Sequence, residues 1–137
     1  MLLPKKVKHR KHQKGRRRNL RDATRKTEVS FGIVGLQSMG HGWVTSRQIE
    51  ATRRVIVRSL RKGGKMWIRI FPDKPITNHG GENTMGSGKG AVDHFVAVVK
   101  PGMMMFEIDG VTEQQGMEAM KAAGYKLSVK TKVVTKN

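Results

Sequence analysis

Hydrophobic residues between residues 45 and 62 recur at the spacing of an amphipathic helix. Ile49, Ile56 and Leu60 fall on one side of a helix drawn at about 100° per residue, and Thr52 lies beside them. The ends of this pattern carry a capping-box pair and two stop glycines, namely Thr45, Gln48, Gly63 and Gly64. We therefore predict a helix that begins after Thr45 and ends near Lys62.

The opposite side of this predicted helix is cationic. Glu50 lies three residues after Arg47 and four before Arg54, which predicts a local ion pair. Because the guanidinium donors form a planar fork that matches phosphate, we interpret this side as a phosphate-binding surface. A charged face that only meets solvent is the alternative, and the sequence leaves it open. The members of this surface, called the arginine face below, are Arg47, Arg54, Arg58 and Arg61.

A second helix is predicted over residues 112–123. Thr112 and Gln115 repeat the capping-box pattern, and Gly124 follows as a stop at the C-terminal end.

Other segments have the residues and turn signals of β-strands. Pro101 and Gly102 suit a type II turn, so we expect the strand after them to return as the hairpin partner of the strand before them. Residues 40–43 are a predicted loop, and residues 77–90 a long one. The predicted strands are residues 29–36, 65–71, 92–99, 103–108 and 125–133, the last with a basic outer face. This order predicts a single α+β domain over residues 29–137 with a mixed or antiparallel sheet and two main helices.

Residues 1–28 have a different composition, with twelve lysines and arginines against Asp22 and Glu28. Such a segment repels itself and has too few apolar residues to offset its ordering entropy. We therefore expect an extended basic N-terminal arm that binds a polyanion. Nucleic acid is the favoured partner, because neutralising phosphates releases condensed counterions. The arm cations predicted to bind are Lys5, Lys6, Lys8, Arg10, Lys11, Lys14, Arg16, Arg17 and Arg18; Arg21, Arg25 and Lys26 complete the twelve.

The whole chain of 137 residues has a formal charge of +18 and a pI near 11.1. This charge favours nucleic acid as partner over an anionic membrane surface. Aromatic residues are few and lie mostly apart from the cations, which favours contact with backbone phosphates and RNA shape over stacking on unpaired bases. No apolar run approaches the roughly 20 residues of a membrane span, and we expect no secretory signal. Because the chain has no cysteine, disulfides and thiolate metal sites are excluded.

The glycine-rich segment at residues 85–90 invites comparison with a nucleotide-binding P-loop. That motif needs glycine where Asn83 stands, serine or threonine where Gly90 stands, and a following helix, but a strand is predicted here. An NTP-hydrolysing enzyme that uses Lys89 is therefore only the third-ranked interpretation. A flexible loop of this kind can still lie along a phosphate chain. Its residues are Met85, Gly86, Ser87, Gly88, Lys89 and Gly90.

Four other features bear on candidate chemistry. Asp93 and His94 are adjacent in a predicted strand and should point to opposite faces, so we expect no dyad. The scattered histidines predict no metal site. The three methionines at residues 103–105 are predicted to fill the core rather than bind copper. Trp43 is expected either to stack on a base or to anchor its loop, and the sequence does not separate these alternatives.

Several segments together resemble the bacterial and organellar large-subunit ribosomal protein family sixteen, which is kin to the archaeal and eukaryotic L-ten-e proteins. The matching pieces occur in the family's order and span nearly the whole chain. Two are highly specific in combination, FPDKP at residues 71–75 and GSGKG at residues 86–90. The others are residues 1–6, 45–51, 64–70, 76–77, 85 and 98–102.

The resemblance implies an α+β fold buried in large-subunit rRNA near the base of the central protuberance, and a part in late subunit assembly. It implies that the arm and the arginine face hold rRNA, and that residues 77–90 reach toward tRNA and the peptidyl-transferase region. One position departs from the family pattern, because Thr84 stands where arginine usually precedes the loop methionine. No role of that arginine is carried over.

The leading hypothesis is a non-catalytic constituent of the large ribosomal subunit, in a bacterial cytoplasmic ribosome or an organellar one. Its expected partners are large-subunit rRNA, tRNA in the A site with P-site tRNA as a further candidate, and neighbouring ribosomal proteins. No cofactor, metal, membrane or small-molecule substrate is expected. The rival hypothesis is a histone-like architectural protein that uses the same arm to bind DNA.

Overall fold

A computed structural model describes residues 1–16, 21–61 and 63–137. The elements follow as β1 (Val34–Ser38), β2 (Gly42–Thr45), α1 (Ser46–Leu60), β3 (Lys65–Ile68), β4 (Lys74–Asn78), β5 (Ala91–Val99), β6 (Met104–Asp109), α2 (Glu113–Gly124) and β7 (Thr131–Thr135). The predicted single α+β domain with two main helices is confirmed. Within the described ranges, no helix has the length and apolar character needed to cross a membrane.

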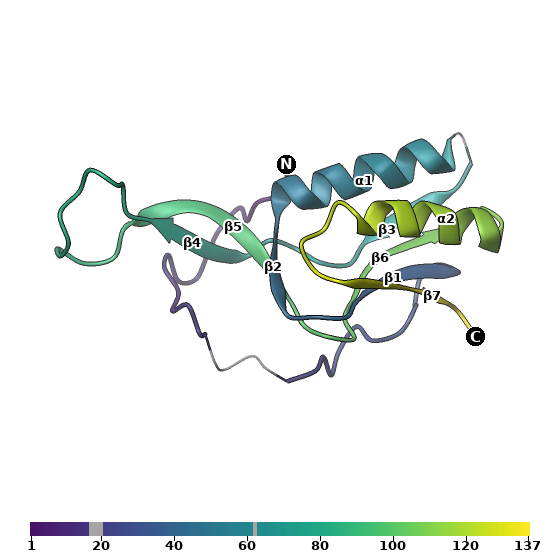
Figure 1. The fold of residues 1–137 in the computed structure, drawn as a ribbon, viewed down its shortest axis with the longest axis horizontal. Coiled ribbons are helices and arrows are strands. Elements are labelled where there is room, and N and C mark those ends of the chain that lie inside the picture. The colour runs from purple at the N-terminus through teal and green to yellow at the C-terminus, as the bar shows by residue number, and fades with distance from the viewer. Residues whose placement is uncertain (17–20, 62) are drawn as a thin grey trace.

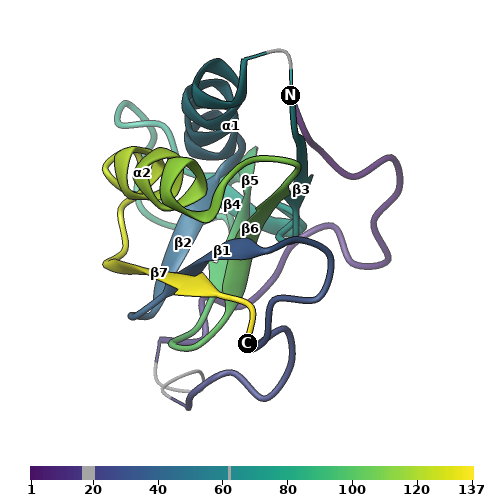
Figure 2. The same cartoon turned by 90° about the vertical axis from the view of Figure 1, so that its right-hand side faces the viewer.

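The strands form two antiparallel sheets (Figure 1). The four-stranded sheet has the order β3-β6-β1-β7, and the three-stranded sheet has the order β2-β5-β4. Helices α1 and α2 lie side by side on one face of the four-stranded sheet (Figures 1 and 2). The β4–β5 hairpin extends away from the helices and ends in the loop of residues 79–90 (Figure 1).

The core lies between the helices and the four-stranded sheet. Phe106 and Ile108 from β6 and Ile56 from α1 have no exposed surface, and burial of each such side chain is worth about 1.5–3 kcal/mol relative to exposure. Met104 and Met105 are equally buried. Met103 packs against the same cluster, so the predicted core-filling role of the three methionines is confirmed.

Helix α1 begins as predicted. Thr45 Oγ1 accepts a hydrogen bond from Gln48 N at 3.2 Å, and Gln48 Oε1 accepts one from Thr45 N at 3.0 Å, which completes the capping box. The helix ends at Leu60, followed by Arg61 with φ 53° and Gly64 with φ 114°. Lys62, where we expected the end, lies outside the described residues. The predicted apolar side is buried, with Ile49, Thr52, Ile56 and Leu60 as its members.

Helix α2 is also confirmed. Only half of the predicted capping box forms, since Thr112 Oγ1 accepts a hydrogen bond from Gln115 N at 3.4 Å but the Gln115 side chain does not bind Thr112 N in return. Gly124 is the last helical residue rather than the stop after it. A Cβ atom at Gly116 would lie 3.0 Å from Val34 Cγ2, which is tighter than ordinary van der Waals contact. Glycine at this position therefore allows α2 to lie close to the sheet.

The strand predicted at residues 29–36 begins too early. β1 starts at Val34, and the three N–H groups of residues 30–32 donate to the carboxylate of Glu107. The Glu107 side chain thus accepts the hydrogen bonds that the backbone of a neighbouring strand would otherwise accept. The local sequence pattern does not indicate this.

Two other predicted strands are longer than the real ones. The strand predicted at residues 65–71 corresponds to β3, which stops at Ile68. The strand predicted at residues 125–133 corresponds to β7, which begins only at Thr131. Residues 125–130 instead form the connection that follows α2, with Val129 buried.

Two strands were missed. β2 overlaps the predicted loop at residues 40–43, and β4 overlaps the start of the predicted loop at residues 77–90. The glycine and proline residues in these segments are typical of loops, so the sequence did not predict strands there. Pro75 is tolerated because β4 is an edge strand that pairs only with β5, and proline, which has no N–H donor, is compatible with an edge strand.

The predicted hairpin of residues 92–99 with residues 103–108 is wrong, although its turn exists. Met103 N donates to Lys100 O at 3.1 Å, and Gly102 has φ 88°. β5 and β6 nevertheless belong to different sheets. The reason is that the turn is bound to the end of β1, since Gly102 N donates to Ser38 O and Ser38 N donates to Met103 O, each at 2.8 Å.

Candidate nucleic-acid interface

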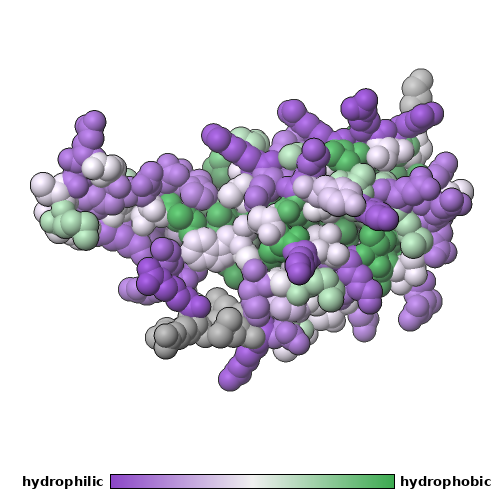
Figure 3. All heavy atoms as spheres, in the orientation of Figure 1, coloured by the Kyte–Doolittle hydropathy of each residue, from purple (hydrophilic) through white to green (hydrophobic). Residues whose placement is uncertain are grey.

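The arginine face projects from α1 on the side away from the core. All four of its members are exposed, and Figure 3 shows hydrophilic side chains along the upper edge of the molecule, where α1 lies. Among the described residues, no carboxylate pairs with Arg47, Arg58 or Arg61. These guanidinium groups therefore face solvent with their donors available.

The predicted local ion pair of Glu50 is confirmed, with Arg54 as the partner. Glu50 pairs with Arg54 at 3.1 Å and with Arg53 at 2.6 Å, but not with Arg47. The hydrogen bond from Arg53 is the main cause that lowers the pKa of Glu50 to about 2, with a smaller contribution from Arg54. Arg54 is thus partly neutralised, which the i, i+4 spacing indicated; the i, i+3 pair with Arg53 was missed.

The described part of the arm contains neither helix nor strand. It runs beside the β4–β5 hairpin and then around the lower side of the molecule (Figure 1). Lys11 is half-buried, and Arg17 and Arg18 lie outside the described residues. The other predicted cations are exposed, namely Lys5, Lys6, Lys8, Arg10, Lys14 and Arg16.

Three lysines join the arm to the hairpin. Lys11 Nζ donates to Lys89 O at 3.0 Å, and Lys89 Nζ donates in return to His12 O. Lys74 Nζ donates to Lys14 O at 2.9 Å. These ammonium groups bind main-chain carbonyls of the protein itself. Lys11 and Lys89, both predicted to face RNA, therefore also connect the arm to the base of the loop.

Trp43 lies on β2, close to residues of the arm. Its ring is half-buried, and Lys74 Nζ lies 4.8 Å from the ring centroid, within reach of a cation–π interaction. The ring also borders a groove of about 350 Å³ together with Lys14 and Arg16 of the arm. These contacts favour the anchoring alternative over base stacking.

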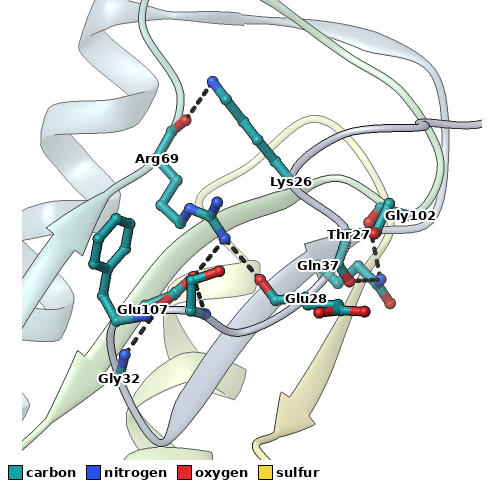
Figure 4. A network of polar contacts seen from close by, with 10 residues as sticks. Lys26, Thr27, Glu28, Gly32, Gln37, Arg69, Gly102 and Glu107 are labelled. Carbon is teal, nitrogen blue, oxygen red and sulfur yellow. Dashed lines mark hydrogen bonds and ion pairs between the residues drawn. The ribbon is translucent and has the colours of Figure 1, made fainter.

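A buried carboxylate fixes the point where the arm enters the domain (Figure 4). Glu107 on β6 has no exposed surface and accepts hydrogen bonds from the backbone of Ser30, Phe31 and Gly32 at 3.1, 2.6 and 3.0 Å. Arg69 Nη1 donates to Glu107 Oε1 at 2.6 Å, completing the set of charge-assisted bonds.

The ionisation of Glu107 follows from these partners. Burial alone would raise the pKa of Glu107, but the three backbone donors and Arg69 lower the pKa overall. Arg69 Nη1 also donates to Glu28 O at 2.7 Å, so the same ion pair holds the last residue of the arm.

Sequence reasoning missed this network. The available signal was an acidic residue inside an otherwise apolar run at residues 103–108, since a buried charge is expected to have a partner. Arg69, which follows β3, was not identified as that partner because the two residues are far apart in the chain.

The loop of residues 79–90 is exposed along almost its whole length. Met85 at its tip is 100% exposed. Gly86, Ser87 and Gly88 have consecutive φ values of 113°, 64° and 91°, a stretch of backbone that favours glycine. As expected, a strand rather than a helix follows this segment, which contradicts a P-loop.

Asp93 and His94 do not point apart as predicted. His94 Nδ1 and Asp93 Oδ2 lie 2.7 Å apart, because the ladder shifts register where Ile76 pairs with His94 and Thr77 pairs with Val92. Asp93 is therefore an extra residue in β5, and the strict alternation of faces fails there. In the part of the chain that the structure describes, no group of three or more His, Asp or Glu side chains is placed to hold a metal ion.

Polar contacts do not join the described part of the arm to the arginine face. No hydrogen bond or ion pair joins the described arm residues to Arg47, Arg54, Arg58 or Arg61. The fold and these surfaces define a strongly basic two-sheet α+β protein with its cations outward, the class that binds nucleic-acid phosphates.

Comparison with known proteins gives the family. A family model described as ribosomal protein L16p/L10e matches residues 4–134, and the chain belongs to this family. It is 52% identical over 136 residues to the large ribosomal subunit protein uL16 of Trichodesmium erythraeum (strain IMS101), covering 99% of this chain and 98% of that protein. It is 54% identical over 134 residues to the large ribosomal subunit protein uL16c of Thalassiosira pseudonana, covering 98% and 96% of the two chains. The uL16c protein of Porphyra purpurea is 52% identical over 137 residues, with 100% and 97% covered.

The resemblance inferred from the sequence is thereby confirmed. A member of this family is a structural ribosomal protein and not an enzyme. The bacterial and plastid relatives also confirm a ribosome of bacterial or organellar type.

Proposed function

We propose that the chain is a constituent of the large ribosomal subunit that binds large-subunit rRNA through its arm and its arginine face. The relatives that support the choice of subunit are large-subunit proteins. The observation that carries the proposal is the exposed arginine face on a helix whose opposite side is buried, in a chain of charge +18. The helix fixes the backbone positions of these arginines, and the planar guanidinium fork loses less freedom for each hydrogen bond that it forms with phosphate.

The proposal extends to the aminoacyl-tRNA site. The loop of residues 79–90 lies at the far end of the β4–β5 hairpin, well away from the helices, and its tip is fully exposed (Figure 1). This position supports a contact of the loop with tRNA in the A site, with P-site tRNA as a further candidate. Neighbouring ribosomal proteins are the remaining partners.

Competition between nucleic acids tests the choice of partner. We expect large-subunit rRNA to displace duplex DNA from the full chain at physiological salt, by about 10³-fold or more, which is the lower range for specific over non-specific binding. Filter binding with both competitors at equal nucleotide concentration measures this preference. Equal binding, or a preference for the duplex, would favour the histone-like alternative.

A charge at the loop tip tests the tRNA contact. Met85→Glu places a negative charge at a fully exposed position, where it should repel tRNA phosphates without affecting the fold. We expect A-site tRNA affinity of large subunits carrying this variant to fall about fivefold, since two charges about 4 Å apart in water interact by about 1 kcal/mol. Met85→Gln is the uncharged control of equal size and should bind tRNA normally. Equal affinity of both variants would place tRNA elsewhere.

A further inference from the structure

A groove of about 460 Å³ is lined by residues at the end of α2, in the connection that follows it and in β7. Strand β7 lies at the edge of the four-stranded sheet opposite β3 (Figure 2). We call this groove the α2–β7 groove. Its less exposed lining residues are Gly124, Val129, Thr131 and Val133, and its exposed ones are Tyr125, Lys121 and Lys130. The volume lies within the roughly 300–1,000 Å³ of small-molecule sites.

The backbone holds Tyr125 in place at the edge of this groove. Lys126 N donates to Ala123 O at 3.0 Å, and Leu127 N donates to Gly124 O at 3.2 Å, so a tight turn closes the end of α2. A Cβ atom at Gly124 would lie 2.4 Å from Thr131 Oγ1, so a larger residue here would force the Thr131 side chain or the strand to shift. The groove is therefore formed before any ligand arrives, and binding requires little further ordering of the protein.

The Tyr125 ring itself is 79% exposed, and its hydroxyl makes no hydrogen bond to another described residue. A single exposed aromatic residue needs no explanation by itself. Here, however, the ring stands beside an apolar surface with a lysine on α2 and another before β7, and none of the described residues that line the groove carries a carboxylate. An aromatic ring, an apolar wall and flanking cations are the chemistry that binds an unpaired nucleotide, because the base stacks and the phosphates meet the ammonium groups.

We propose that the α2–β7 groove binds one unstacked nucleotide of RNA, with its base on Tyr125 and its phosphates at Lys121 and Lys130. The inference rests on the proposed rRNA-binding function and adds to it a contact that reads an exposed base. It also revises the expectation that the chain contacts only phosphates and RNA shape.

The single tyrosine of the chain gives a direct probe. Full-length protein labelled with 3-fluorotyrosine has one ¹⁹F resonance, from residue 125. We expect single-stranded RNA oligonucleotides to shift this resonance, and abasic oligonucleotides of equal length to leave it unshifted. Equal shifts with both would assign the groove to phosphates alone and overturn the proposal, as would no shift by an oligonucleotide that binds.

Affinity for large-subunit rRNA provides the second readout. Tyr125→Ala should weaken binding about fivefold or more without changing its salt dependence, because stacking releases no counterions, and Tyr125→Phe should bind normally. Lys121→Gln with Lys130→Gln should reduce the salt dependence. The exposed ring makes Tyr125→Ala harmless to folding, which its circular dichroism spectrum checks.

The two proposals fail in different ways. If the unchanged chain binds large-subunit rRNA but Tyr125→Ala binds it equally well, the groove proposal is wrong and the proposed function stands. If the unchanged chain does not bind this rRNA, both are wrong. A resonance shift that appears only with a neighbouring ribosomal protein would assign the groove to a protein contact and overturn the proposal.

Discussion

The buried carboxylate of Glu107 shows how one side chain can determine the path of a whole segment. Its two oxygens accept three backbone N–H groups and one guanidinium donor, so the negative charge is compensated although no water reaches it. The segment that joins the arm to β1 is held across the sheet by these bonds. Loss of the charge would leave buried donors without a partner, and this costs more free energy than replacing the whole network by apolar side chains.

Glu107→Gln should therefore destabilise the protein by about 3 kcal/mol at neutral pH, since the variant keeps the size of the side chain but lacks the charge. Urea denaturation of both proteins measures this difference. Arg69→Lys is a milder change, because lysine keeps the positive charge but lacks the planar guanidinium group. Its free energy of unfolding should lie between those of the unchanged protein and Glu107→Gln.

The pH dependence has a definite sign. The pKa of Glu107 is lower in the folded protein than its ordinary value of 4.5, so the carboxylate stabilises the fold fully above that value. The contribution is lost as the pH falls below 4.5 toward the folded pKa. The stability difference between the unchanged protein and Glu107→Gln should thus be constant from pH 7 to 5 and shrink below 4.5. A difference that stays constant to pH 3 would contradict this role.

At the scale of elements, α1 combines two surfaces with different tasks. Its buried side fixes the helix on the domain, and its exposed side carries the arginine face. Both sides were predictable because the 3.6-residue period and the capping box are local signals. The same holds for α2 and β5, because the residues that predict each of them are close together in the sequence.

The elements that could not be predicted depend on distant residues. β2 and β4 form because both pair with β5, and the residues within these two short segments do not indicate that pairing. The turn at Gly102 has the expected local form, but bonds to Ser38 send β5 and β6 into different sheets. In the candidate interface, the arginine face was predictable for the same local reasons, whereas the lysine contacts between the arm and the hairpin were not.

The capping box of α1 offers a test of this element. Thr45→Ala removes the side-chain acceptor for Gln48 N and should destabilise the protein by about 1 kcal/mol. Thr45→Ser keeps a hydroxyl acceptor and should stay close to the unchanged protein. The urea midpoints of the three proteins measure this difference. An equal loss of stability in both variants would show that the threonine methyl group, and not the capping hydrogen bond, stabilises the helix.

At the scale of the whole molecule, cations lie on two parts of the chain around one small core. The arm begins beside the start of α1 (Figures 1 and 2) and runs along the β4–β5 hairpin, and the arginine face lies along α1, so we expect one RNA to contact both. A charge of +18 repels itself in the free chain, and a polyanion relieves this repulsion. We therefore expect bound rRNA to stabilise the fold as well as to be stabilised by it.

The most direct test of the central claim is the salt dependence of binding to large-subunit rRNA. It is measured for the unchanged chain, for an arm variant with Lys5, Lys6, Lys8 and Arg10 changed to Gln, for a helix variant with Arg47, Arg54, Arg58 and Arg61 changed to Gln, and for the combined variant. Each lost phosphate contact should flatten the slope of log K against log salt by about 0.7–0.9, and the combined variant should lose the sum of both reductions. If either fourfold variant binds with the affinity and slope of the unchanged chain, that surface does not contact rRNA phosphates and the account is wrong.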